Sequence, residues 1–318
     1  MTHSARLTRA AFVALTGAAC LRPTGARAAT QIQAGSAADD DATPFLYAQR
    51  SGIFARAGID GQLQAMRSGS AVASAVLGGT FQFGKSSVMS LINARGRGHA
   101  PIVIVAPAGV YESTAPVTGL LVKADGPIKT PADLNKQIIA VSALNDLYTV
   151  STKAWIDAHG GDSSTVQFTE IPISAVPEAV AAGRVAAGNL LEPDLTVAAD
   201  AKKTRVLGHP FDAIAHRFTF SAWFTTVDYA TKNKDVVEKF VAALREAANY
   251  TNTHHAETAQ VLADFTKVDV GVIRRSTRST AGTTLEAGDV QHSIDVAVKY
   301  KALPAPFDAR EMLWPPRS

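Results

Sequence analysis

The chain has 318 residues, 47% of them hydrophobic and 19% charged, with a formal net charge of +3 at pH 7. Residues 1–29 hold four of the 31 basic side chains and no acidic one, so the remainder is close to neutral. This near-neutral charge argues against nucleic acid or an anionic membrane as a partner. The length of the chain suits two lobes better than a single hydrophobic core.

The first 29 residues have the pattern of a secretory signal peptide. Arg6 and Arg9 form a basic start, a short apolar run ends at Cys20, and Ala26 to Ala28 give a small-x-small cleavage pattern. Neither this run nor any later segment reaches the roughly 18 apolar residues of a membrane span. Cys20 is the only cysteine, so the mature chain has no disulfide, thiolate metal site or cysteine nucleophile. We expect a periplasmic protein, and not a lipoprotein anchored through Cys20, because Gly17 stands where a lipobox prefers a larger aliphatic residue.

From residue 30 onward, strand-like runs alternate with helix starts. The first section has predicted strands at 31–37, 61–66, 80–83 and 101–106, with helices opening at 43, 69 and 86. The second has predicted strands at 119–122, 138–141, 166–171 and 186–191, with helices opening at 130, 142 and 177. A long strand at 218–226 and an amphipathic helix at 236–249 follow. The alternation predicts an α/β fold with mostly parallel sheets in two related lobes.

Hydroxyl residues stand where several predicted strands run into helices: Thr43, Ser70, Ser86 or Ser87, and Ser142. Ligands of open α/β sheets bind beyond the carboxyl ends of the strands, where helix N-termini offer free N–H groups. Two such sheets facing each other would form a cleft for a small anion or polar carbonyl compound. The alternative is that these residues are ordinary helix caps.

Catalytic and metal-binding patterns are absent from the sequence, which has no G-x-S-x-G, H-E-x-x-H or phosphate-loop motif. His254 and His255 are adjacent on a predicted helix and point in different directions, so a solvated face is expected. Arg274, Arg275 and Arg278 are likewise predicted to form a solvated basic patch. We therefore predict no catalytic residue, no metal and no cofactor.

Several segments together resemble the sulfonate/nitrate/taurine-type solute-binding proteins of ABC importers, over about residues 30–253. The segments that carry the resemblance are Pro44–Phe54 with Gly58–Asp60, Ile128–Val141, Ala182–Ala187, Leu191–Pro193 and Thr226–Phe240. Ala187 and Gly188 depart from the family pattern, which commonly has an Asp and a small apolar residue there, and 135–137 replace its usual Lys-Gly-Lys.

The resemblance implies a two-lobe periplasmic-binding-protein fold (Venus flytrap, type II) with hinge crossings near 119–122 and 221–225. Lobe 1 would comprise residues 30–119 plus 223–318, and lobe 2 residues 120–222. It also implies a monomeric exported receptor, not an enzyme, that captures a small organic or oxyanion solute and delivers it to a permease and an ATPase. Two alternatives stay open: the ligand-binding subunit of a periplasmic sensor, and an enzyme similar to the fungal thiamine-pyrimidine synthases. That enzyme chemistry relies on a Cys-rich iron motif, which the mature chain lacks.

Candidate ligand-binding residues follow the predicted strand ends, the second hinge and the Glu-Pro turn. They are Asp41, Thr43, Pro44, Phe45, Gly69, Ser70, Ser86, Ser87, Pro107, Tyr111, Ser142, Leu144, Asn145, Asp146, Glu192 and Trp223. Helix starts and serine hydroxyls favour a sulfonate, nitrate or carboxylate, whereas the carboxylates favour a neutral or amino-bearing heterocycle such as a pyrimidine. The charge of the ligand therefore stays open at this point.

Overall fold

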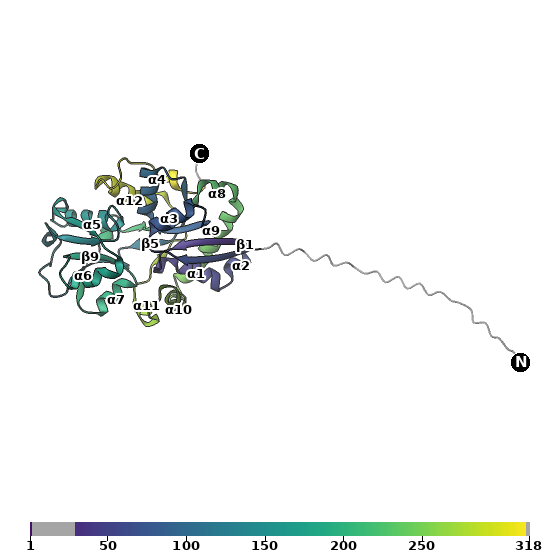
Figure 1. Cartoon of the computed structure of the whole chain (residues 1–318), viewed down its shortest axis with the longest axis horizontal. Coiled ribbons are helices and arrows are strands. Elements are labelled where there is room, and N and C mark those ends of the chain that lie inside the picture. The colour runs from purple at the N-terminus through teal and green to yellow at the C-terminus, as the bar shows by residue number, and fades with distance from the viewer. Residues whose placement is uncertain (2–28, 316–318) are drawn as a thin grey trace.

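The computed structural model describes Met1 and residues 29–315, so the predicted signal peptide lies almost wholly outside the described residues. From Thr30 onward the chain forms two lobes side by side, each built around a five-stranded sheet with helices packed on it (Figure 1). This arrangement confirms the predicted two-lobe α/β fold. Within the described part of the chain, no helix is long and apolar enough to cross a membrane.

The first lobe contains a sheet of order β2-β1-β3-β12-β4. Its strands are β1 (Thr30–Ser36), β2 (Ile59–Ala65), β3 (Phe83–Ser87), β4 (Ile102–Pro107) and β12 (Ser221–Thr226). The helices α1 (Thr43–Arg50), α2 (Ile53–Arg56), α3 (Gly69–Leu77), α4 (Val88–Gly98), α8 (Val227–Lys232) and α9 (Lys234–Thr251) belong to this lobe. On one side of the sheet an aromatic core forms, in which Phe83 stacks on Phe240 at 3.9 Å between ring centroids.

The second lobe contains a sheet of order β10-β6-β9-β7-β8. Its strands are β6 (Thr118–Lys123), β7 (Ile138–Val141), β8 (Gln167–Glu170), β9 (Ala187–Leu191) and β10 (Thr204–Gly208), and its helices are α5 (Leu147–Ala158), α6 (Val176–Ala181) and α7 (Asp194–Asp200). Four of the five strands in each sheet run in the same direction, as the prediction of mostly parallel sheets requires. In each of them one strand, β12 or β6, runs antiparallel to both neighbours, because the chain enters it from the other lobe.

The chain crosses between the lobes along β5 (Gly109–Glu112) and β11 (Arg217–Thr219), which pair with each other. A third strand, β13 (Thr280–Ala281), pairs with the other edge of β5, so the hinge is a small three-stranded sheet. The crossings were expected several residues later, at 119–122 and 221–225. Those residues belong instead to β6 and β12, inside the two main sheets. The exact lobe boundaries stay a prediction.

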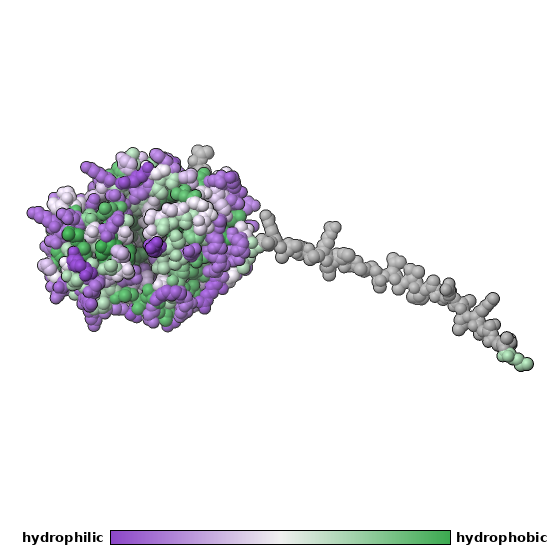
Figure 2. All heavy atoms as spheres, viewed as in Figure 1, coloured by the Kyte–Doolittle hydropathy of each residue, from purple (hydrophilic) through white to green (hydrophobic). Residues whose placement is uncertain are grey.

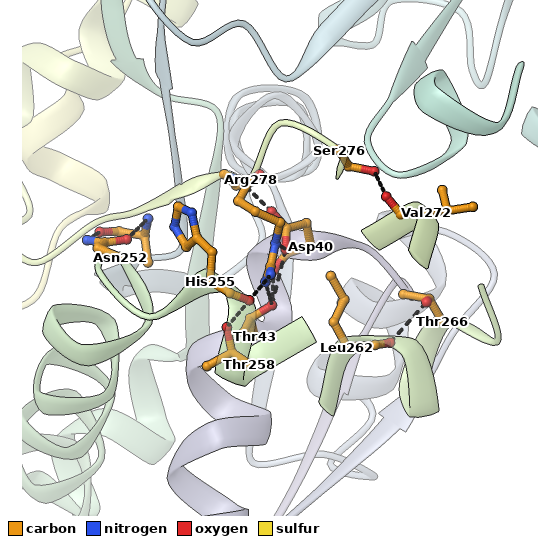
Figure 3. Close-up of polar contacts among 12 residues, drawn as sticks. Asp40, Thr43, Asn252, His255, Thr258, Leu262, Thr266, Val272, Ser276 and Arg278 are labelled. Atoms are coloured by element: carbon orange, nitrogen blue, oxygen red, sulfur yellow. Dashed lines mark hydrogen bonds and ion pairs between the residues drawn. The ribbon is translucent and has the colours of Figure 1, made fainter. Parts of the chain in front are cut away.

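The C-terminal segment carries α10 (His255–Thr266), α11 (Val270–Arg275) and α12 (Ala287–Lys299). Arg278, just after α11, is not part of a solvated patch as predicted. Its side chain is 6% exposed and pairs at 2.7 Å with Asp40, which is 3% exposed (Figure 3). Arg278 also donates to the Thr43 hydroxyl and to the His255 carbonyl, each at 3.1 Å. The buried ion pair therefore anchors the C-terminal segment to the loop between β1 and α1.

Candidate solute-binding cavity

A cavity of about 530 Å³ lies between the two lobes and is lined by residues of both. The space-filling view shows the surface hollowed between the lobes (Figure 2). The lining residues follow the carboxyl ends of β1, β2 and β3 in the first lobe and of β7 and β8 in the second. This is the edge of an open α/β sheet at which ligands bind.

Serines form much of the first-lobe wall. Ser68 caps α3 by accepting from the Ala71 amide at 3.2 Å, and Ser87 caps α4 by accepting from the Met89 amide at 3.3 Å. Ser86 is 4% exposed, and its hydroxyl has no hydrogen-bond partner among the residues that the structure describes. A buried hydroxyl without a partner costs free energy, so Ser86 has unused bonding capacity beside the cavity.

A buried cluster of Asp39, Asp41 and Lys85 forms the floor of the cavity on the first-lobe side. The Lys85 ammonium, whose side chain is 2% exposed, contacts both carboxyl groups, and Asp41 also accepts from the Ser221 hydroxyl. Burial and then repulsion from Asp41 raise the pKa of Asp39 well above its usual range. Burial opposes ionisation of Asp41 as well, but Lys85 and the hydrogen bonds from Asp39 and Ser221 together outweigh it, and the pKa of Asp41 is lowered.

Burial also disfavours the charge on Lys85, yet the two carboxyl groups outweigh it and raise the pKa of Lys85. The lysine therefore stays an ammonium ion that is neutralised within its own cluster. Asp39 is the member that reaches the cavity most openly, with 24% of its side chain exposed.

The second-lobe wall begins with the loop after β7. Asp146 caps α5 and accepts from the Ser142 hydroxyl at 2.6 Å, the Ala143 amide at 3.2 Å and the Thr149 amide at 2.8 Å. Burial raises the pKa of Asp146, although these hydrogen bonds act against the shift. Glu170 accepts from the Leu144 amide at 2.6 Å. Two backbone donors of this loop, the Ala143 and Leu144 amides, are thus bonded to carboxylates of the chain itself.

The rest of the second-lobe wall and the back of the cavity are apolar. The residues concerned are Leu147, Tyr148, Ile171, Ile173, Leu191, Phe211 and Phe220. Tyr148 and Phe211 stack with ring centroids 5.8 Å apart. Burial raises the pKa of Tyr148 well above its usual range, so its phenol stays neutral. Such a mixture of apolar surface and a few polar groups is typical of pockets for small organic molecules.

The cavity brings together seven of the residues predicted from sequence: Asp41, Gly69, Ser70, Ser86, Ser87, Ser142 and Asp146. Leu144 and Asn145 lie on the same loop as Ser142 but do not line the cavity. Leu144 is largely exposed, and the Asn145 carbonyl accepts from Asn93 of the first lobe at 3.1 Å. Whether the seven lining residues contact a ligand stays a prediction.

The other predicted residues lie away from the cavity. Phe45 and Trp223 stack in the first-lobe core with centroids 5.2 Å apart, because β12 is a central strand covered on both faces. Thr43 and Pro44 are buried in the first turn of α1, and Pro107 is buried at the end of β4.

Two further predicted residues have partners inside the protein. The Tyr111 hydroxyl donates to Asp212 at 2.8 Å, and burial followed by this bond raises the pKa of Tyr111. Glu192, 5% exposed, accepts from the Thr196 amide at the start of α7 at 3.0 Å. Both residues are therefore bonded within the fold.

The sequence analysis missed 17 of the 24 residues that line the cavity. The missed polar and charged residues are Asp39, Arg67, Ser68, Lys85, Ser90, Tyr148, Glu170 and Ser221. Lys85 precedes Ser86 at the same strand end, and Ser68 adjoins Gly69, so proximity to the predicted residues would have found both. Phe211 and Phe220 have no local signal, because long-range packing brings them to the cavity.

The comparisons with known proteins agree with this architecture. The aliphatic sulphonate binding protein SsuA from Escherichia coli has a TM-score of 0.74 and 20% identity over 91% of this chain and 93% of its own. The alkanesulfonate-binding protein SsuA from Xanthomonas axonopodis pv. citri, bound to MOPS, has a TM-score of 0.75 and 17% identity, covering 91% and 99%. The nitrate-binding protein NrtA from Synechocystis PCC 6803 has a TM-score of 0.71 and 16% identity, covering 88% and 84%.

At such identities the likeness shows the fold alone, which is that of periplasmic binding proteins. No curated protein sequence matches the chain. The profile of the family described as "NMT1/THI5 like" matches residues 39–258, more than half of the chain. This protein therefore belongs to the NMT1/THI5-like family, as the resemblance in its sequence predicted.

Proposed function

We propose that this protein is an exported solute receptor that binds a small molecule between its lobes and delivers it to an ABC importer. The observation that carries the proposal is the 530 Å³ cavity, which both lobes line at their strand ends. Family membership and the periplasmic binding proteins among its structural neighbours support the same role. Of the predicted residues, the seven that line the cavity are the proposed ligand contacts.

Closure of the lobes on the solute is the proposed mechanism. A ligand that touches both walls binds the closed state better, so it shifts the population toward closure. In the part of the chain that the structure describes, the polar contacts between the lobes away from the hinge include Asn93 with Asn145, Arg275 with Asp200, and Tyr300 with Asp157 at 2.9 Å. The contact between Arg275 and Asp200 is solvent-exposed and costs little to rearrange.

A thermal-shift screen of the purified protein tests the receptor role. The panel contains alkanesulfonates, taurine, nitrate, aromatic carboxylates, amines, pyrimidines and flavins. A ligand that binds the folded state raises the melting temperature by mass action. Stimulation of a reconstituted permease and ATPase by the loaded receptor would then support import. Failure of every class to bind would contradict the proposal.

The sensor alternative differs only in the docking partner, so a response of a cognate sensor kinase in place of an importer would favour it. The enzyme alternative is the weaker one. No histidine lines the cavity among the described residues, and the single cysteine lies in the predicted leader. An iron-dependent product formed by the purified protein would establish that alternative.

A further inference from the structure

The charged groups around the cavity are unequal in number and in availability. Among the described lining residues, Asp39, Asp41, Asp146 and Glu170 are acidic, and only Lys85 and Arg67 are basic. The Lys85 side chain is 2% exposed and is already held by two carboxyl groups, so it is not free for an anion. Arg67 and Glu170 both line the cavity, are exposed and carry opposite charges, which leaves more acidic than basic side chains among the other lining residues.

Some of the N–H donors that an oxyanion would use are already bonded. Ser68 and Ser87 accept from amides in the first turns of α3 and α4, the two first-lobe helices that begin at the cavity. In the second lobe, Asp146 occupies the N-terminus of α5 with its own negative charge. An anionic ligand placed there would meet a like charge in place of a free helix terminus.

Acceptors, in contrast, remain available to a ligand. Asp39 has 24% of its side chain exposed, and once it is ionised beside a bound cation its carboxylate only accepts hydrogen bonds. The Ser86 hydroxyl, buried to 4% exposure and without a partner among the described residues, can accept a second N–H group. Ser86 does not belong to the acidic cluster, so its unpartnered hydroxyl is a second, independent indication that a ligand binds here.

The opposite wall is suited to an apolar body. Tyr148, Phe211 and Phe220 offer aromatic rings, and isoleucine and leucine side chains complete the surface. Aromatic faces attract cations through their electron-rich π systems, in addition to burying apolar area. The volume of about 530 Å³ accommodates a small organic molecule.

We propose that the cavity selects a solute with a cationic nitrogen head, a primary ammonium or an amidinium, attached to an apolar or aromatic body. The head lies against Asp39 and Ser86, and the body lies against the second-lobe aromatic residues. This inference rests on the proposed role as a solute receptor and specifies the chemistry of its ligand. It excludes a sulfonate or nitrate as the preferred solute.

Four probes that share one phenethyl body but differ in the head test this inference: phenethylamine, phenethyl alcohol, 3-phenylpropionate and 2-phenylethanesulfonate. Titration calorimetry of the full protein should give the tightest binding for the amine, by about tenfold or more over either anion. Tighter binding of the sulfonate or carboxylate overturns the inference but leaves the receptor role intact. No binding of any probe also overturns it, and the receptor role is then decided by the wider panel.

Asp39→Asn separates the head-group contact from general effects on folding. It should weaken phenethylamine binding by about tenfold and leave the alcohol within about twofold. Asp228→Asn, at a carboxylate 72% exposed on α8, is the matched control and should change neither affinity. An equal loss for amine and alcohol in Asp39→Asn contradicts the inference.

Proton release gives a second, independent readout. Burial and Asp41 raise the pKa of Asp39 and Lys85 opposes the shift, while Asp39 is among the acidic groups that raise the pKa of Tyr148 in the second lobe. An ammonium bound beside Asp39 would lower this pKa, so binding should release protons and tighten as the pH rises. Calorimetry in buffers of different ionisation enthalpy measures the number released. Proton uptake, or none, on amine binding would count against the assigned contact.

Discussion

Replacing Arg278 with methionine removes the cation from a buried ion pair while keeping an unbranched apolar stem of similar length. Arg278 and Asp40 are 6% and 3% exposed, so the Asp40 carboxylate would stay buried without its counter-charge. Breaking such a pair costs about 3–5 kcal/mol. The Ser279 amide still donates to Asp40, which places the expected loss near the lower end, at about 3 kcal/mol.

Denaturant unfolding of the wild type and of Arg278→Met measures this loss as a shift in the midpoint. For a chain of this size the melting temperature should fall by roughly 10 °C. The double variant with Asp40→Asn should recover part of the loss, because it removes the buried charge.

Arg275→Met is the matched control, since its pair with Asp200 is about half exposed on both sides and should contribute at most about 1 kcal/mol. If Arg278→Met costs no more than this control, the argument from burial is wrong.

Three further outcomes follow from the packing and charges at the cavity. Trp223→Ala should cost about 3–5 kcal/mol of stability, measured by denaturant midpoint, because Trp223 is 1% exposed in the core. Gly69→Ala would place a Cβ atom 2.1 Å from the Ser86 hydroxyl oxygen, so it should cost about 1–3 kcal/mol in the same assay. Burial and then Asp41 raise the pKa of Asp39, so its contribution to stability is present at low pH and is lost as the pH rises through the raised pKa. Melting temperatures against pH should therefore fall less steeply for Asp39→Asn than for the wild type.

Each of these outcomes has a control. A Trp223→Ala variant of unchanged stability that loses ligand affinity would return Trp223 to the binding site. Adding Ser86→Ala to Gly69→Ala should restore stability if the clash is the cause. For the pH series, the neighbouring Asp41 titrates in the opposite sense, because its pKa is lowered. If the stability of the wild type rises with pH over the whole pH range, the titration of Asp41 outweighs that of Asp39.

The strand ends and helix starts could be predicted from sequence because their signals are local. The run at 101–106 is apolar throughout, and the strand that it forms is wholly buried. The serines that follow the predicted strands do lie at helix starts beside the cavity, although Ser68 and not Ser70 supplies the cap of α3. Local sequence signals of this kind locate a site but do not predict the charge of the groups that line it.

The remaining features depend on contacts between residues far apart in the chain. Asp40 and Arg278 are 238 residues apart, and nothing near Arg278 distinguishes it from the exposed Arg274 and Arg275. The position of Trp223 could not be predicted from sequence. Both faces of the inner strand β12 are covered, so the alternation of polar and apolar residues along it does not show on which face Trp223 lies. Lys85 was overlooked because a buried lysine is recognised only by its partners, which follow a different strand.

The hinge strand β13 begins one residue after Ser279, whose amide is bonded to Asp40, and Asp40 lies between the two cavity carboxyl groups Asp39 and Asp41. The floor of the cavity and the third strand of the hinge are therefore joined through a single side chain. If the proposed solute displaces this loop on binding, we expect the displacement to reach β13 through Asp40 and so to change the angle between the lobes without passing through either main sheet.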